Sequence, residues 1–261
     1  FVVFIYSDDY VKNDYIEKLL LPMIEHQLDL CMAGFIRIFA SSKSIECPVS
    51  KEKILITEKH IISELLLPVI GADISYKSDV EREMCVWRNM YRRSLIEKIN
   101  LRFVSEREYI SEDIFFNMHY FINCKKAMLI PDCIYYYSEN ENSLSNTYRN
   151  DRFEKYCKML NEQICILKNY DIYEISKQRL YRTFLMKTKK CIKMIAKSNL
   201  NRNEKIDTIN KILDNITLKN VLSEYNLTLK MGLKKYIIIY LIKKQKSKYL
   251  LFFYSMFKSS L

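Results

Sequence analysis

Two pairs of neighbouring acidic residues could place carboxylates where chemistry is done. The first pair, Asp8 and Asp9, follows Ser7 directly after the apolar residues 1–6. Adjacent carboxylates at the carboxyl end of a strand can bind Mg²⁺ or Mn²⁺ together with the oxygens of a diphosphate, and the cation then stabilises the departing diphosphate. The same residues could equally supply a turn and an N-cap for the next helix. By itself, this motif leaves both interpretations open.

The second pair, Glu112 and Asp113, stands in the predicted first turn of a helix over residues 112–123, with Ser111 as its N-cap. The free backbone N–H groups and the positive end of a helix stabilise an ionised carboxylate there. Asp113 could then accept a proton from an attacking sugar hydroxyl, and Glu112 could orient that acceptor. Acidic residues also favour the first turn of helices without any catalytic role, and this alternative stays open too.

An α/β pattern over residues 1–150 must position these carboxylates. Residues 1–6 are continuously apolar, β-branched or aromatic, which predicts a buried parallel strand. The predicted strands are residues 1–6, residues 28–40 and two short strands within 127–137, on either side of Pro131. The predicted helices are residues 15–27, 58–69 with Gly71 as C-cap, and 112–123, with a polar loop over 41–53 and a mixed strand and helix over 83–99. The predicted fold class is therefore α/β.

Residues 151–229 lack strand signals and carry apolar residues at helical spacing, which predicts a helical extension. Its predicted helices are residues 153–170, 175–196 and 202–213. The last segment, residues 230–261, contains eight lysines and no acidic residue, so residues 1–229 carry only +3 (11 − 8) of the net charge of +11. We therefore predict three parts, residues 1–150, 151–229 and 230–261.

The basic tail, residues 230–261, alternates lysines with Ile, Leu, Phe and Tyr. Its apolar runs, residues 236–242 and 249–257, are well short of the ~20 residues that span a bilayer. The pattern suits helices that lie in the headgroup layer of a membrane, where lysines meet anionic lipid. A helical hairpin packed on the domain with its lysines outward is the alternative.

The composition excludes several classes of protein. With 49% hydrophobic residues and only 3 Gly and 4 Pro, the chain is neither a disordered segment nor a linker. The 8 cysteines include no C-x-x-C pair and indicate reduced thiols in a cytoplasmic protein. A nucleic-acid-binding protein needs basic and aromatic residues spread over one face, whereas here the positive charge is concentrated in the apolar tail. We therefore expect no nucleic-acid partner.

In order and spacing, these motifs resemble those of family 2 glycosyltransferases of the GT-A fold. The resemblance covers residues 1–148 and begins with FVVFIYSDDYVKNDYIEKL, which is similar to the family's strand-DSDD-helix segment. The family's later pattern, an ED-headed helix, a hairpin ending in Tyr-x-Tyr and a Ser-rich loop, resembles VWRNMYRRSLIEKINLRF followed by YISEDIFFNMHYFINCKKAMLIPDCIYYYSENENSLS. The resemblance implies a truncated GT-A sheet with a mainly helical C-terminal extension.

The resemblance also implies roles for four carboxylates. Asp8 and Asp9 match the acids that contact the ribose and the metal, Mn²⁺ or Mg²⁺. Asp113 matches the general base of the inverting members, and Glu112 matches its partner in the ED pair. The implied reaction moves a sugar from a nucleotide-diphospho-sugar, expected to be a UDP-sugar, to a glycan or lipid-linked acceptor. The implied context is the synthesis of bacterial cell-surface polysaccharide.

Five further positions match more loosely or depart from the family pattern. Ser143 and Ser145 fall in the loop that tends to cover the nucleotide diphosphate. Trp87 lies where members place acceptor-side groups, with packing in the core as the alternative. Tyr6 replaces the first Asp of DSDD, which weakens the case for metal binding, and Ser138 stands where Arg is frequent.

The family's first strand, of the VSVIIPVYN type, and the strand-helix repeats that bind uracil and ribose have no counterpart in the chain. The resemblance therefore implies the C-terminal part of a catalytic domain, inactive by itself. Its expected location is the cytoplasm or the inner face of the cell membrane. The alternative is a catalytically dead, membrane-associated partner of another glycosyltransferase.

Overall fold

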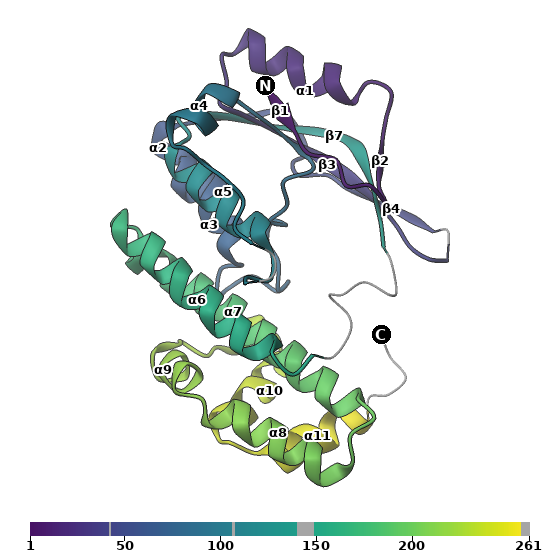
Figure 1. The fold of residues 1–261 in the computed structure, drawn as a ribbon, viewed down its shortest axis with the longest axis vertical. Coiled ribbons are helices and arrows are strands. Elements are labelled where there is room, and N and C mark those ends of the chain that lie inside the picture. The colour runs from purple at the N-terminus through teal and green to yellow at the C-terminus, as the bar shows by residue number, and fades with distance from the viewer. Residues whose placement is uncertain (42, 106–107, 140–148, 257–261) are drawn as a thin grey trace. The chain divides into compact units, whose positions relative to one another are not determined.

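The computed structural model describes residues 1–261 except 42, 106–107, 140–148 and 257–261 (Figure 1). The chain forms two compact units. The α/β unit contains Phe1–Val69, Arg82–Ser105 and Ser111–Asn146, and the helical unit contains Ile70–Glu81, Glu106–Ile110 and Thr147–Leu261. The predicted fold class, α/β with a helical C-terminal region, is confirmed.

The α/β unit is built on a curled seven-stranded sheet with the order β1-β6-β3-β7-β2, in which β4 also pairs with β3 and β5 with β7. The strands are β1 (Val2–Val3), β2 (Tyr10–Val11), β3 (Leu30–Ile38), β4 (Ser44–Cys47), β5 (Ile54–Thr57), β6 (Asn89–Tyr91) and β7 (Lys126–Ser138). Strands β3 and β7 run parallel at the centre, and every other pairing in this sheet is antiparallel.

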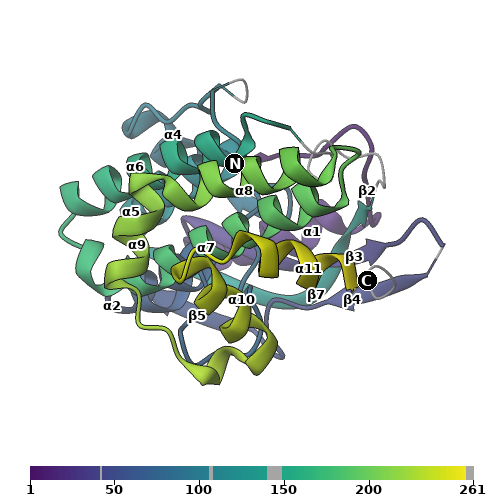
Figure 2. The same cartoon turned by 90° about the horizontal axis from the view of Figure 1, so that it is seen from below.

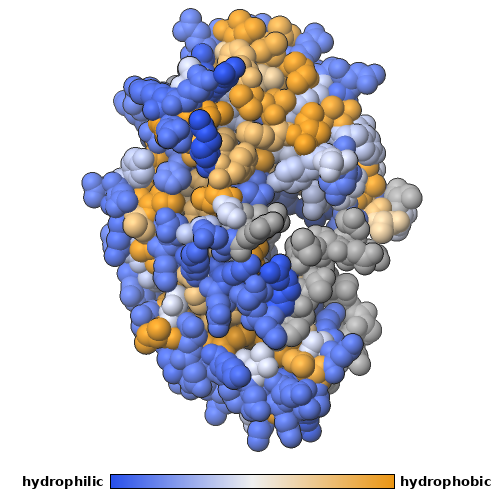
Figure 3. Space-filling view, viewed as in Figure 1, coloured by the Kyte–Doolittle hydropathy of each residue, from blue (hydrophilic) through white to orange (hydrophobic). Residues whose placement is uncertain are grey.

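Helices cover both faces of this sheet. In Figure 1, α1 (Tyr15–Glu25) and α5 (Glu112–Asn123) lie on opposite sides of it. Helix α1 packs on the sheet through Leu19 and Met23, which are fully buried among the core side chains. The outer side of α1 is also apolar, so that Figure 3 shows orange side chains over this helix at the top of the view.

The predicted strand over residues 1–6 is wrong in length and direction. Only Val2–Val3 forms a strand, and it is half-buried and pairs antiparallel with β6. Phe4 leaves the ladder because its ring packs on Phe116 of α5 and on Phe103 of the loop before α5, with centroid distances of 5.4 Å and 5.1 Å. The following residues are therefore free to form a turn and not a continued strand.

The residues around Pro131 form one strand, β7, and not the predicted two. Proline removes a backbone donor, but the β3–β7 ladder shifts register on both sides of Gly34, which pairs with Cys133, and this irregularity accommodates the missing N–H. A Cβ on Gly34 would lie 2.8 Å from both Cys133 Sγ and Pro48 Cα, so only glycine permits this approach. The predicted polar loop over residues 41–53 likewise contains a strand, β4, which pairs with β3.

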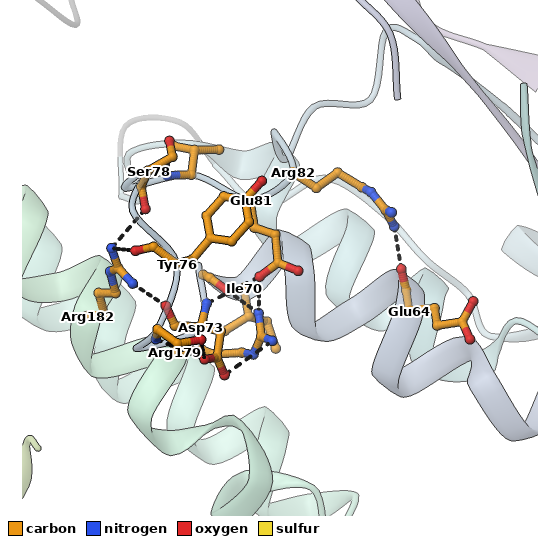
Figure 4. Close-up of polar contacts among 12 residues, drawn as sticks. Glu64, Ile70, Asp73, Tyr76, Ser78, Glu81, Arg82, Arg179 and Arg182 are labelled. Atoms are coloured by element: carbon orange, nitrogen blue, oxygen red, sulfur yellow. Dashed lines mark hydrogen bonds and ion pairs between the residues drawn. The ribbon is translucent and has the colours of Figure 1, made fainter. Parts of the chain in front are cut away.

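The predicted helix over residues 58–69 exists, but in three pieces. These are α2 (Glu58–His60), a π-helix (Ile61–Leu66) and α3 (Leu67–Ile70). The wider π-helical turn alters the pairing of the carbonyl groups. One of them, the Glu64 carbonyl, accepts a hydrogen bond from the guanidinium of Arg82 (Figure 4). The mixed element predicted over residues 83–99 is confirmed as β6 followed by α4 (Arg93–Lys98).

The helical unit is organised around its longest helix, α7. The helices are α6 (Arg152–Asn169), α7 (Tyr173–Lys197), α8 (Arg202–Asp214), α9 (Ile216–Glu224), α10 (Leu233–Lys243) and α11 (Ser247–Met256), with a 3₁₀ turn at Leu229–Met231. Helices α6, α8, α10 and α11 all contact α7, and the three helices predicted here are confirmed. Within the described residues, no helix is both long enough and apolar enough to cross a bilayer.

Two arginines of α7 hold the segment 70–81 in the helical unit (Figure 4). Arg182 is 0% exposed, and its guanidinium donates to three carbonyl oxygens, those of Asp73, Tyr76 and Ser78. Arg179 donates to the Gly71 carbonyl at 2.9 Å. Gly71 does not adopt the left-handed conformation of the predicted helix cap. Glycine is required at position 71 for another reason: a Cβ there would collide with the Arg179 carbonyl on α7.

Candidate active site

The Ser7-Asp8-Asp9 segment forms a turn between β1 and β2, closed by a hydrogen bond from the Asp9 N–H to the Tyr6 carbonyl at 3.2 Å. It does not cap a helix, because α1 begins at Tyr15 with Asp14 as its N-cap. The predicted turn is therefore confirmed, and the predicted N-cap is wrong. Asp8 is exposed and Asp9 is half-buried.

Strand β2 brings Asp9 alongside β7. The β2–β7 ladder pairs Tyr10 with Tyr136, and Asp9 precedes it by one residue. Both of its carboxylate oxygens accept hydrogen bonds there, Oδ2 from the hydroxyl of Tyr135 at 2.7 Å and Oδ1 from the backbone N–H of Ser138 at 2.9 Å. Burial raises the pKa of Asp9 above its ordinary value, and these two donors partly offset that effect.

The carboxylate of Asp113 is buried, with the side chain only 8% exposed. Both of its oxygens lie 3.1 Å from the hydroxyl of Tyr6, and Oδ2 also accepts from the Val86 N–H at 3.2 Å. Burial and the neighbouring charge of Glu112 raise the pKa of Asp113 to about 6. A carboxylate that only caps its own helix would bond to that helix, whereas Asp113 bonds to residues of two other segments.

The helix α5 begins as predicted, but Ser111 does not cap it. Its backbone is left-handed (φ 73°), and its side chain makes no capping hydrogen bond. From the first turn of α5, Asp113 reaches Tyr6 and Val86, which both lie outside the helix. Glu112 is more exposed than Asp113.

Hydrogen bonds connect the two acidic motifs, which are far apart in the sequence. The Tyr6 hydroxyl donates to Asp113, while the Tyr6 N–H donates to the Tyr135 hydroxyl at 3.1 Å, which in turn donates to Asp9. Neither Tyr6 nor Tyr135 is among the site residues that the sequence predicts. The available signal was Tyr6 itself, since it occupies the place of the first acid in the DSDD pattern.

Two curated proteins match the chain in sequence. The chain is 24% identical over 181 residues to the uncharacterized glycosyltransferase EpsJ of Bacillus subtilis, and 22% identical over 194 residues to the glycosyltransferase GlyA of Streptococcus pneumoniae. The chain is similar in sequence to bacterial glycosyltransferases. These matches cover 69% and 71% of the chain, but the chain spans only 50% of EpsJ and 25% of GlyA. No protein-family model matches it.

Solved structures of one bacterial protein, TarS, match almost the whole chain. The crystal structure of S. aureus TarS 1-349 superposes with a TM-score of 0.57 at 14% identity, covering 98% of this chain and 66% of TarS. The complex of the same TarS segment with UDP-GlcNAc gives a TM-score of 0.59 at 16% identity, covering 98% and 67%. The chain therefore shares its fold with TarS.

A metal ion in this site would rest on Asp8 and Asp9. No group of three or more His, Cys, Asp or Glu side chains that could hold a metal occurs among the described residues. Asp9 already accepts two hydrogen bonds, whereas Asp8 makes none with another described residue. Mg²⁺ commonly binds through one or two carboxylates, substrate phosphates and waters. The donor set thus fits a cation held jointly by the protein and a diphosphate.

The remaining predicted residues divide into three kinds. Trp87 is a core residue, 5% exposed and stacked on Tyr135 with ring centroids 4.4 Å apart. Ser138 contributes to the site through its backbone N–H, which fixes Asp9. Ser143 and Ser145 lie outside the described residues, so their contact with a diphosphate stays a prediction.

Proposed function

We propose that the chain is part of an inverting, cation-dependent glycosyltransferase of family 2 with the GT-A fold. It would move a sugar from a UDP-sugar to a hydroxyl of a glycan or lipid-linked acceptor. The observation that carries this proposal is the buried carboxylate of Asp113, linked by Tyr6 to the Asp8-Asp9 turn. Further support comes from the sequence similarity to EpsJ and GlyA and from the fold of TarS, which has been crystallised with UDP-GlcNAc.

Asp113 is the general base of the proposed reaction. With its pKa raised to about 6, the carboxylate is ionised near neutral pH and still basic enough to take a proton. As the proton of the acceptor hydroxyl passes to Asp113, the acceptor oxygen forms a bond to the anomeric carbon of the donor. The bond from that carbon to the diphosphate oxygen breaks, and UDP leaves with the electron pair. A single displacement inverts the anomeric carbon and needs no covalent enzyme intermediate.

The other carboxylates bind the cation or orient the acceptor. Asp8 and Asp9 would hold Mn²⁺ or Mg²⁺, which neutralises the negative charge of the departing diphosphate. Tyr135 and Ser138 keep the Asp9 carboxylate in one orientation. Glu112, which is partly exposed beside the buried base, would orient the acceptor.

Release of UDP from a panel of UDP-sugars in the presence of Mn²⁺ tests this function. The assay should use the product of the complete reading frame, because the chain spans half the length of EpsJ. We expect at least one UDP-sugar to give UDP release above that of the Asp113→Asn variant. If every UDP-sugar fails both to bind and to react, the catalytically dead partner becomes the better explanation.

Tyr6→Phe should move the acid limb of the pH profile of kcat to higher pH. The Tyr6 hydroxyl donates to the ionised form of Asp113 and so lowers its pKa; without it, that pKa rises above about 6. Because the reaction needs ionised Asp113, activity then declines at a higher pH, by about one unit. The other titratable groups interacting with Asp113 are Glu112, Cys85 and Tyr91.

For Tyr6→Phe, kcat is measured from pH 5 to 9 at intervals of about half a pH unit. Asp113 is ionised at the upper end of this range. Tyr10→Phe is the matched control, since the exposed Tyr10 stacks on Tyr136 and makes no contact with Asp113. An acid limb that stays in place in Tyr6→Phe would show that Tyr6 does not act on Asp113.

We also propose that the tail binds the anionic surface of a membrane peripherally. Helices α10 and α11 pack on the helical unit, as the hairpin interpretation expects, through residues such as Ile239 and Leu250. Their outer sides nevertheless expose large apolar side chains next to the lysines: Leu233, Ile237, Tyr240, Tyr249 and Phe252. An exposed surface of this composition suits insertion into a headgroup layer.

Replacing Lys243, Lys244 and Lys246 together by Gln should weaken binding to phosphatidylglycerol vesicles by about a hundredfold, since each lysine near an anionic surface contributes about 1 kcal/mol. These lysines are exposed, so the change leaves the packed side of the tail intact. Co-sedimentation measures the binding. A triple variant with the same charge change in the α/β unit, at the exposed lysines 51, 53 and 59, is the control. An equal loss of vesicle binding in both triple variants would contradict binding through the tail.

A further inference from the structure

A pocket of about 420 Å³ lies in the helical unit where the end of α7, the start of α8 and helix α11 meet. Helices α8 and α11 run side by side in both Figure 1 and Figure 2. The pocket is in the range of volumes that hold small ligands. Its position next to the exposed apolar residues of α11 is the first indication of what it binds.

The charges around this pocket are all positive. Four cationic side chains line it, and none of the described lining residues is acidic: Lys197, Arg202, Lys205 and Lys248. Arg202 and Lys248 are exposed and make no ion pair with another described residue. The nearest acid in the sequence, Glu204, is engaged in the capping box of α8, where it accepts from the Asn201 N–H at 2.8 Å.

One lysine of the pocket is held in place. The Lys205 ammonium donates to the carbonyl of Ala196 in the last turn of α7 at 3.0 Å, which leaves two of its three donors for a ligand. The excess of positive charge extends along α7. Burial and the neighbouring charges of Lys197 and Lys234 hold the pKa of Lys193 below its usual value. Cations that line one pocket without an acidic residue among the described lining favour an anionic ligand.

The other lining of the pocket is apolar. Leu251 is buried and Phe252 is 61% exposed, so that Phe252 forms an apolar edge between the pocket and solvent. Tyr254 also lines the pocket, and its buried hydroxyl has no hydrogen-bond partner among the described residues. The pocket therefore combines cationic side chains with an apolar edge.

We propose that this pocket binds the phosphate headgroup of an anionic lipid, with the four cations around the phosphate and the beginning of the lipid chain against Leu251 and Phe252. A free phosphate would use the cations but not the apolar edge, and a neutral lipid would use the edge but not the cations. The inference deepens the membrane proposal by naming one headgroup site. It does not depend on glycosyl transfer.

The test uses soluble short-chain lipid, so that binding to a pocket is measured without a membrane surface. Dihexanoyl phosphatidic acid, dihexanoyl phosphatidylcholine and inorganic phosphate are titrated into the protein by calorimetry. We expect phosphatidic acid to bind at least about tenfold more tightly than either of the other two, because only it has both the charge and the chain.

Two charge-matched double variants locate the site. Arg202→Gln with Lys248→Gln removes two pocket cations, and should weaken binding of the phosphatidic acid by about tenfold or more. Lys243→Gln with Lys244→Gln removes two exposed tail lysines outside the pocket and should change it by less than about twofold. Circular dichroism checks that each variant is folded.

Three results would overturn the proposal. Equal losses in the two double variants would mean diffuse attraction and no pocket. Inorganic phosphate binding as tightly as the short-chain lipid would mean an ion site. Vesicle binding without any binding of short-chain phosphatidic acid would support the tail surface alone, and would thereby separate failure of the pocket from failure of the membrane proposal.

Discussion

Asp113→Asn, made in the product of the complete reading frame, should lower kcat for sugar transfer by about 10²- to 10⁴-fold, the usual contribution of a positioned general base. Asparagine keeps the size and can still accept hydrogen bonds from Tyr6 and Val86, but it cannot take a proton. The KM for the UDP-sugar should change little, because Asp113 acts on the acceptor hydroxyl. The measurement is UDP release together with product formation.

The same substitution should not destabilise the fold, which separates a catalytic role from a structural one. Burial raises the pKa of Asp113 to about 6, so the folded protein binds this proton more tightly than the unfolded chain. The contribution of Asp113 to the free energy of unfolding is therefore most favourable below about pH 4 and is lost as pH rises through about 6. Relative to that maximum, ionised Asp113 lowers the free energy of unfolding at neutral pH by on the order of 3 kcal/mol. The substituted asparagine carries no charge, so Tm at neutral pH should stay equal or rise.

Asp132→Asn is a matched control for Asp113→Asn, because Asp132 pairs with Lys18 at 2.9 Å on the surface of the same unit. It should leave kcat within about twofold. If Asp113→Asn keeps full activity, or if it loses activity only in proportion to a fall in Tm, Asp113 is not the base.

Asp8→Asn and Asp9→Asn should each raise the Mn²⁺ concentration needed for half-maximal UDP release, by about tenfold or more, because each removes a carboxylate from the cation. EDTA should abolish activity in the unsubstituted protein, and added Mn²⁺ should restore it. Of the two variants, Asp8→Asn gives the clearer test of metal binding. Asp8 is exposed and bonds to no other described residue, so its loss cannot act through the fold.

Asp9→Asn should in addition lower Tm, because Asp9 uses both carboxylate oxygens, Oδ2 for the Tyr135 hydroxyl and Oδ1 for the Ser138 N–H, whereas asparagine has only one acceptor oxygen. Leaving one of these donors without its acceptor costs about 1–3 kcal/mol. Tyr135→Phe provides the comparison, since it removes one of those bonds and keeps the carboxylate. Activity that is unchanged by EDTA, with wild-type Mn²⁺ dependence in Asp8→Asn, would contradict a metal site here.

The α/β order, the helices and the two acidic pairs could be predicted from the sequence because their signals are local. Apolar residues at helical spacing predict α6, α7 and α8 within a few residues. The position of Asp113 in the first turn of α5 follows from the periodicity of residues 112–123. Such patterns depend on neighbours along the chain, which a single sequence displays.

Strand partners were harder to predict. The apolar residues 1–6 predict a buried parallel strand, yet only Val2–Val3 pairs, antiparallel with β6. A short apolar run does not say which strand it will pair with or where it will leave the sheet. Here the ring of Phe4 packs on Phe103 and Phe116, and that contact decides where β1 ends.

Only the tertiary structure connects the two acidic motifs, through the hydrogen bonds of Tyr6 and Tyr135. Tyr6 and Asp113 are separated by 107 positions, and Tyr135 and Asp9 by 126, so no spacing along the chain reveals their hydrogen bonds. In the sequence Tyr6 stands in place of the first Asp of the DSDD pattern, whereas in the fold its hydroxyl contacts the carboxylate proposed as the base. The reason is physical: residue type determines what a side chain can donate or accept, but sheet pairing and helix packing determine which partner it meets.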